Sequence, residues 1–117
     1  MTTISIVSIP VTDQQVSKDF YIKIGFQLIT EADMGTGSTW VQLGLPEQPT
    51  SITLVNWFKE MTAGSVQGLV LKSEDIEKEV ADLKAKGVEV KAIDNTPWGR
   101  FASFSDPDGN GLTLWQG

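Results

Sequence analysis

The chain has 117 residues, of which 40% are hydrophobic and 21% charged, and this composition predicts one globular domain with its own core. Fifteen acidic against nine basic residues give a formal net charge of −6, which disfavours nucleic acid and anionic membranes as partners but is compatible with a cationic ligand. The absence of histidine and cysteine excludes disulfides, thiolate chemistry and zinc sites built from these residues. The missing cysteines, with no signal-peptide pattern and no apolar run of about 20 residues, predict a cytoplasmic protein.

The first half of the chain predicts a strand, a helix and three further strands. Residues 3–12 are rich in β-branched side chains and predict a buried strand. Asp13 then caps a helix that ends at Gly25 and whose apolar side chains, four residues apart, are Val16, Phe20 and Ile24. Turn residues separate the three strand-like runs that follow, at 26–32, 38–44 and 51–57.

The second half repeats this order. Residues 65–72 predict a strand, and the helix after it has Ser73 as its cap candidate, Gly87 as its stop, and the apolar stripe Ile76, Val80 and Leu83. Three more strands are predicted at 88–93, 100–105 and 111–116, with the tight turn "DPDGN" (106–110) before the last of them. The turn contains D-x-D-G, but its spacing does not continue as a calcium-binding loop.

The helix signals are spaced alike in the two halves. Asp13 to Gly25 spans twelve residues, and so does Asp75 to Gly87, so the chain predicts an internal βαβββ duplication. We expect a single domain over 1–117, with module one at about 1–58 and module two at about 64–117, in an α+β architecture. Because each helix covers one face of its sheet, the other face must close on the partner half or on a second chain, which favours a homodimer.

Nearly the whole chain resembles one known group of proteins. The resemblance rests on the segments "IVSIPVTDQQVSKDFYIKIGF", "SEDIEKEVADLKAKGVEV" and "PWGRFASFSDPDGNGLTLWQ", of which the last, with its Trp-Gly and "DPDGN", is the most specific. The group is the vicinal oxygen chelate superfamily of glyoxalases, bleomycin-resistance proteins and extradiol dioxygenases. Membership implies paired βαβββ modules that form a cupped mixed sheet around a pocket, usually in a homodimer. In the metal-dependent members, four side chains, usually His, Glu or Gln, hold a divalent ion that polarises a substrate with neighbouring oxygens.

The resemblance also places the metal-ligand positions on this sequence. They fall on Ile6, Gly68, Thr113 and, within a residue or two, Thr53. Ile and Gly offer no side-chain donor, and a hard cation needs roughly six oxygen ligands, more than two neutral hydroxyls supply. The resemblance therefore implies a member without the metal site, and we expect no cofactor.

The tryptophans are the main candidates for contact with a ligand. Strand alternation places Thr53, Val55 and Trp57 on one face, and Thr113 and Trp115 on another. The further candidates are Trp40, Trp98 and Arg100. An aromatic-lined pocket suits planar or cationic organic ligands, and Arg100 could bind an anionic group. The alternative is that each Trp is a core or interface residue and that Arg100 forms a surface salt bridge. Tyr21, beside Phe20, is expected to pack on the helix with its hydroxyl near the surface.

Three functions remain open. The favoured one is a metal-independent protein of the bleomycin-resistance type that sequesters or carries an aromatic or cationic small molecule in a Trp-lined cup. The second is a lyase- or dioxygenase-like enzyme that uses no cofactor, or a metal held by carboxylates such as Glu31, Asp33 or Asp94, although no acid or base with a tuned pKa is identified. The third is a scaffold or regulatory subunit whose cup is filled by Ile6, Val55 and Trp115.

Overall fold

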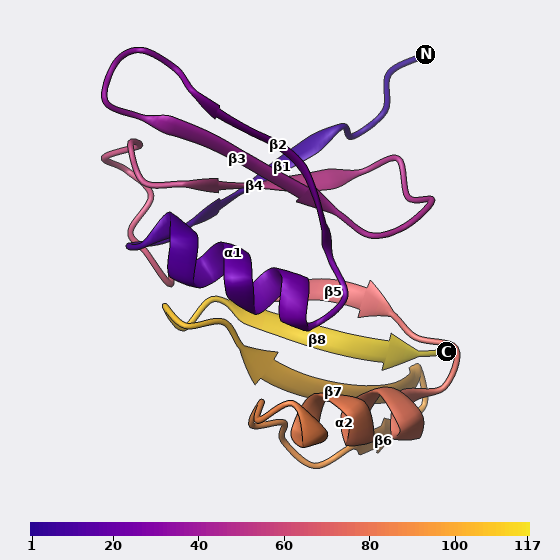
Figure 1. Ribbon diagram of the computed structural model, residues 1–117. Helices are drawn as coiled ribbons and strands as arrows, with labels where there is room; N and C mark the ends of the chain where they lie inside the picture. The colour runs from indigo at the N-terminus through magenta and orange to yellow at the C-terminus, as the bar shows by residue number, and fades with distance from the viewer.

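The computed structural model describes residues 1–117 and has the element order expected for a duplicated βαβββ chain (Figure 1). The first half contains β1 (Ile6–Pro10), α1 (Gln14–Lys23), β2 (Gln27–Asp33), β3 (Thr39–Gly44) and β4 (Ser51–Val55). The second half contains β5 (Leu69–Lys72), α2 (Ile76–Ala85), β6 (Asp94–Thr96), β7 (Gly99–Ser105) and β8 (Gly111–Gln116). The predicted α+β fold of two βαβββ units is confirmed.

Each half forms its own four-stranded sheet. Sheet A has the order β1-β4-β3-β2 and sheet B the order β5-β8-β7-β6, and in both the first strand runs parallel to the last. In sheet A, Gln42 lies opposite Thr53, and in sheet B, Ser103 lies opposite Thr113. Because each of these pairs joins the third and fourth strands of its unit, they occupy corresponding places in the two sheets.

Only one of the two predicted N-terminal helix caps is correct. Asp13 begins α1 as predicted, since its carboxylate accepts hydrogen bonds from the backbone N–H groups of Gln15 and Val16 at 3.0 and 3.2 Å. The cap of α2 is Asp75, which accepts from Lys78 N at 3.2 Å, so the prediction of Ser73 as the cap is wrong. Ser73 donates its backbone N–H to Trp115 O at 2.7 Å and therefore still belongs to the sheet. Neither ten-residue helix is long and apolar enough to cross a membrane.

The buried face of α1 differs from the predicted stripe. Val16 is 52% exposed, whereas Ser17 and Tyr21 are fully buried. The reason is a second contact: besides packing on sheet A, α1 meets the 106–110 turn, where the Tyr21 hydroxyl donates to Asp106 Oδ2 at 2.9 Å. The expectation that this hydroxyl lies near the surface is therefore wrong.

The 106–110 turn ties the two halves together. Asn110 donates its side-chain amide to Pro10 O at 2.8 Å and accepts from Val66 N at 3.1 Å, so one side chain bridges the end of β1 and the approach to β5. Thr12 N donates to Asp108 Oδ1 at 3.1 Å. Gly109, at φ +95°, supplies the left-handed conformation that the predicted turn needs. The turn is thus also the joint between the halves.

One hydrophobic core lies between the two sheets. Sixteen buried residues from both halves form a single cluster, and α1 lies between the sheets in Figure 1. No strand of sheet A approaches a strand of sheet B within 8 Å between Cα atoms. The helix-covered faces of both sheets contribute residues to this core, and the opposite faces, which we call the outer faces, are turned away from it.

Three element boundaries differ from the sequence prediction in ways that affect the site. The strand predicted at 88–93 is wrong, because β6 instead covers Asp94–Thr96. Lys91 N still donates to Ser103 O at 2.9 Å, but this pair is out of register with Asp94 opposite Phe101, so the ladder breaks between them. Trp57 lies two residues beyond the end of β4, and Gly68 lies just before β5.

Candidate ligand-binding site

The outer face of sheet A carries a pair of tryptophans. Val41, Leu43, Ile52 and Leu54 point into the core, so the alternate residues of β3 and β4 point outward. Trp40 lies on this outer face, and Trp57 follows β4 with its ring centroid 6.5 Å from that of Trp40 at an interplanar angle of 30°. We call this surface the Trp40–Trp57 face. It offers two adjacent indoles whose planes are tilted by 30° to each other, and such rings can stack on a flat aromatic ligand.

A chain of side-chain hydrogen bonds fixes this face. Trp40 Nε1 donates to Gln42 Oε1 at 3.1 Å, and Gln42 Nε2 donates to Ser51 Oγ at 2.8 Å. The Thr53 hydroxyl donates to Val41 O at 3.0 Å, and the residue is only 1% exposed. Because the indole N–H already has a partner, Trp40 is held in one orientation before any ligand arrives, which lowers the entropy cost of binding.

The outer face of sheet B holds a single, tightly seated indole. Trp115 Nε1 donates to Trp98 O at 3.0 Å. A Cβ added to Gly99 would lie 2.7 Å from that nitrogen, and one added to Gly117 would lie 2.6 Å from Cζ2 of the same indole. The seat therefore exists because both residues lack a side chain. Phe101 lies opposite Trp115 in the ladder, on the same face.

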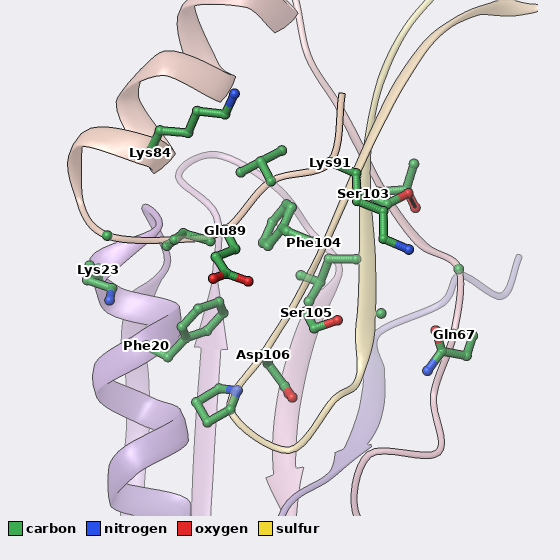
Figure 2. A pocket seen from close by; sticks show the side chains of 18 residues that line it. Phe20, Lys23, Gln67, Lys84, Glu89, Lys91, Ser103, Phe104, Ser105 and Asp106 are labelled. Carbon is green, nitrogen blue, oxygen red and sulfur yellow. Dashed lines mark hydrogen bonds between the residues drawn. The ribbon is translucent and has the colours of Figure 1, made fainter. Parts of the chain in front are cut away.

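Polar groups lie two residues further along this face. The hydroxyls of Ser103 and Thr113 are 3.2 Å apart and hydrogen-bonded to each other. They line a hollow of about 980 Å³ that also reaches Phe20 and Lys23 of α1 and the segment 87–91 (Figure 2). We call it the edge hollow.

Comparison with known proteins assigns the chain to a family. The model of the glyoxalase/bleomycin resistance protein/dioxygenase superfamily matches residues 3–114. The chain belongs to this superfamily. The protein YetH of Bacillus subtilis (strain 168) is 35% identical over 116 residues, which are 95% of each chain.

Solved structures of superfamily members agree with the fold. TnmS3, an antibiotic binding protein from Streptomyces sp. CB03234, is 42% identical and superposes with a TM-score of 0.93, covering 99% of this chain and 96% of that one. A glyoxalase/bleomycin resistance protein from the same organism is 43% identical, with a TM-score of 0.86 over 97% of this chain and all of that one.

The positions at which metal-dependent superfamily members chelate an ion do not fit a divalent cation here. Ile6 and Gly68 have no donor atom. The hydroxyls of Thr53 and Thr113 are already hydrogen-bonded, to Val41 O and Ser103 respectively, and they lie on different sheets. Nor do any three Asp or Glu side chains of the chain gather closely enough to hold a metal ion. We therefore derive no metal-dependent step.

The other predicted ligand contacts lie in different surroundings. Arg100 points to the helix-covered side of sheet B, where its guanidinium pairs with Glu77 at 2.8 Å and Asn95 at 3.1 Å. Trp98 is 77% exposed at the tip of the β6–β7 hairpin. Val55 is buried at the end of β4. Of the predicted residues, the structure thus brings Trp40, Thr53, Val55 and Trp57 together on sheet A, and Thr113 and Trp115 on sheet B.

The carboxylates considered for an enzyme do not gather into one site. Glu31 is on the α1 side of β2, where hydrogen bonds from Lys18 and Gln15 hold the pKa of its carboxyl below the ordinary value. Asp33 accepts from Gly35 N in the β2–β3 turn, and Asp94 lies on the edge strand of sheet B. Ile6 and Trp115, whose contact would fill a cup within one chain, belong to different sheets.

Sequence reasoning missed three polar residues of these faces. Gln42 and Ser103 lie opposite Thr53 and Thr113, so strand alternation alone could have placed both on the outer faces. Lys91 lines the edge hollow but sits in the irregular stretch before β6, where no periodicity indicates the direction of a side chain.

Proposed function

We propose that the protein binds a planar aromatic small molecule without a metal, and sequesters or carries it. The observation that carries this proposal is a pair of aromatic faces whose rings are held in place before a ligand binds. Trp40 and Trp57 lie on sheet A and Trp115 on sheet B, and the indole N–H groups of Trp40 and Trp115 already donate hydrogen bonds within the protein. Strands β1, β3 and β4 carry no ionisable side chain beside the sheet A rings. The likeness to TnmS3, an antibiotic binding protein, supports a binding role over a catalytic one.

The proposal includes a homodimer. Within one chain the two faces belong to separate sheets whose strands do not approach each other, so neither alone encloses a ligand. A second copy that placed its Trp40–Trp57 face over the sheet B face would close a cup. The outer edges of β1 and β5 are unpaired, and such a contact would cover exposed apolar side chains on these strands, Ile6 (40% exposed) and Val70 (51%), and Ile4 (71%) just before β1.

A titration with a neutral flat probe tests the binding role. 9-Anthracenemethanol should quench the tryptophan emission in a saturable way, with about one site per chain. Because a stacked aromatic ring is worth about 1–3 kcal/mol by alanine substitution, Trp115→Ala should weaken binding by roughly tenfold or more. Ile22→Ala, on the exposed side of α1, is the matched apolar control and should leave the affinity unchanged. Absence of saturable binding, or equal effects of the two variants, would contradict the proposal.

A further inference from the structure

The edge hollow is opposite in charge to the chain as a whole. The chain carries −6 overall, but three lysines line the hollow, Lys23, Lys84 and Lys91. Only two carboxylates line it, Glu89 and Asp106. Asp106 is 5% exposed and saturated, since it accepts from the Tyr21 hydroxyl, the Asn110 amide and two backbone N–H groups. Three basic residues against two acidic ones give the lining a formal charge of +1, and Glu89 is the only one of its carboxylates without internal hydrogen bonds.

These charges are unevenly distributed along the hollow. Figure 2 shows Glu89 together with Phe20 and Lys23 on the α1 side, whereas the ammonium of Lys84, on α2, is directed away from them. Lys91 lies apart from them, beside Ser103. Lys18 and Lys78 are paired with Glu31 and Asp82 elsewhere on the protein, whereas the Lys91 ammonium forms no salt bridge and no hydrogen bond.

The part of the hollow around Lys91 and Ser103 thus has hydrogen-bond donors without a matching acceptor. Ser103 and Thr113 supply one hydroxyl proton beyond the one that they share, because each hydroxyl can donate once. The free Lys91 ammonium adds three more donors. The outer face of sheet A has no ionisable side chain on β1, β3 or β4 to oppose this charge across a closed cup.

We infer that the ligand of this site carries an anionic oxygen group, such as a carboxylate or a phenolate, and that Lys91 with Ser103 and Thr113 binds that group. The inference rests on the proposed binding function and adds the charge of the ligand to it. It replaces the cationic ligand suggested by the net charge, because a cation would meet an unpaired ammonium here. Charge-assisted hydrogen bonds to an oxyanion are about twice as strong as neutral ones, so Lys91 would select among ligands of similar shape.

Three anthracenes that differ only in one charged group test this inference. The probes are anthracene-9-carboxylate, 9-anthracenemethanol and 9-anthracenemethylamine, which at pH 7 are anionic, neutral and cationic. Their dissociation constants are measured by calorimetry on the wild-type protein, on Lys91→Gln, and on Lys86→Gln. Lys86 lies at the exposed C-terminal end of α2 and does not line the hollow, so its variant changes the net charge equally.

The wild-type protein should bind the carboxylate about fivefold to tenfold more tightly than the alcohol, and the ammonium more weakly than either. Lys91→Gln should remove most of the preference for the carboxylate and leave the alcohol within about twofold, whereas Lys86→Gln should change neither. If the ammonium binds as well as the carboxylate, or if both variants act alike, the charge assignment is overturned while the aromatic site stands. If no anthracene binds, the proposed function itself fails, and the charge assignment with it.

Discussion

Replacing Tyr21 by Phe removes one hydroxyl from the joint between the two halves. Tyr21 is fully buried, and its hydroxyl is one of four donors to the Asp106 carboxylate, at 2.9 Å. Loss of a hydrogen bond to a charged group costs about 1.5–3 kcal/mol, and the three remaining donors keep the carboxylate from being left bare. We therefore expect the free energy of unfolding at pH 8 to fall by about 2 kcal/mol, with a drop in Tm of roughly 5–10 °C.

The same substitution has a pH signature. Burial, and next the negative charge of Asp106, raise the pKa of Tyr21 well above its ordinary value. A raised folded-state pKa gives stability that is present below the unfolded pKa of about 10 and is lost as pH rises, because the unfolded chain releases the proton first. At pH 11 the wild-type protein should have lost about 1.4 kcal/mol from this group, and Tyr21→Phe none, so the difference between them should shrink to about 0.6 kcal/mol.

Urea unfolding at pH 8 and pH 11, followed by tryptophan emission, measures both effects. Thr50→Val is the control, since the exposed Thr50 hydroxyl also donates one hydrogen bond, to Ile4 O at 2.8 Å, and its loss should cost less than about 0.5 kcal/mol at either pH. Tyr21 is the only tyrosine, so tyrosinate absorbance reports it alone. A tyrosinate signal from the folded protein with a midpoint near pH 10, or an unchanged energy difference between the two pH values, would refute the reasoning.

Two further predictions concern single side chains. Gly99→Ala should shift the emission of Trp115 and lower Tm. Gly99 has φ +125°, and a Cβ at this position would lie 2.6 Å from Gln116 O and would also press against the indole of Trp115. An unchanged emission spectrum would show that Gly99 does not position Trp115. Asp75→Ala should cost about 1 kcal/mol in thermal unfolding as the true cap of α2. Ser73→Ala should be neutral or stabilising, since the buried Ser73 hydroxyl has no partner, and a loss as large as that of Asp75→Ala would restore Ser73 as a cap.

The order of elements could be predicted because its signals are local. Asp13 and Gly25 delimit α1, and the repeat of the same spacing at Asp75 and Gly87 indicates the duplication without any tertiary information. The buried side of α1 could not be predicted in this way. Apolar residues spaced four apart predict the buried side of a helix that packs on a single partner. Helix α1 has two partners, sheet A and the 106–110 turn, and the contact with the turn buries Tyr21.

The site was predictable to the extent that strand alternation holds. It placed Thr113 and Trp115 on one face correctly, and it would also have turned Arg100 toward the helix had it been counted from the buried Ala102 and Phe104. Strand alternation could not place Lys91, because the ladder with β7 breaks near this residue. It also could not predict the close packing around Trp115, which depends on Gly99 and Gly117 coming together at the end of the sheet.

Mixing two variants with weakened binding tests directly whether an aromatic cup forms between two copies of the chain. Trp40→Ala damages only the sheet A face, and Trp115→Ala only the sheet B face. If each cup joins the sheet A face of one copy to the sheet B face of the other, a heterodimer of the two variants contains one intact cup. Unfolding and refolding the variants together at equal amounts should then restore about a quarter of the wild-type capacity for 9-anthracenemethanol, because half of the dimers are mixed and each has one good cup of two. Binding no better than that of the separate variants would contradict a cup shared between copies.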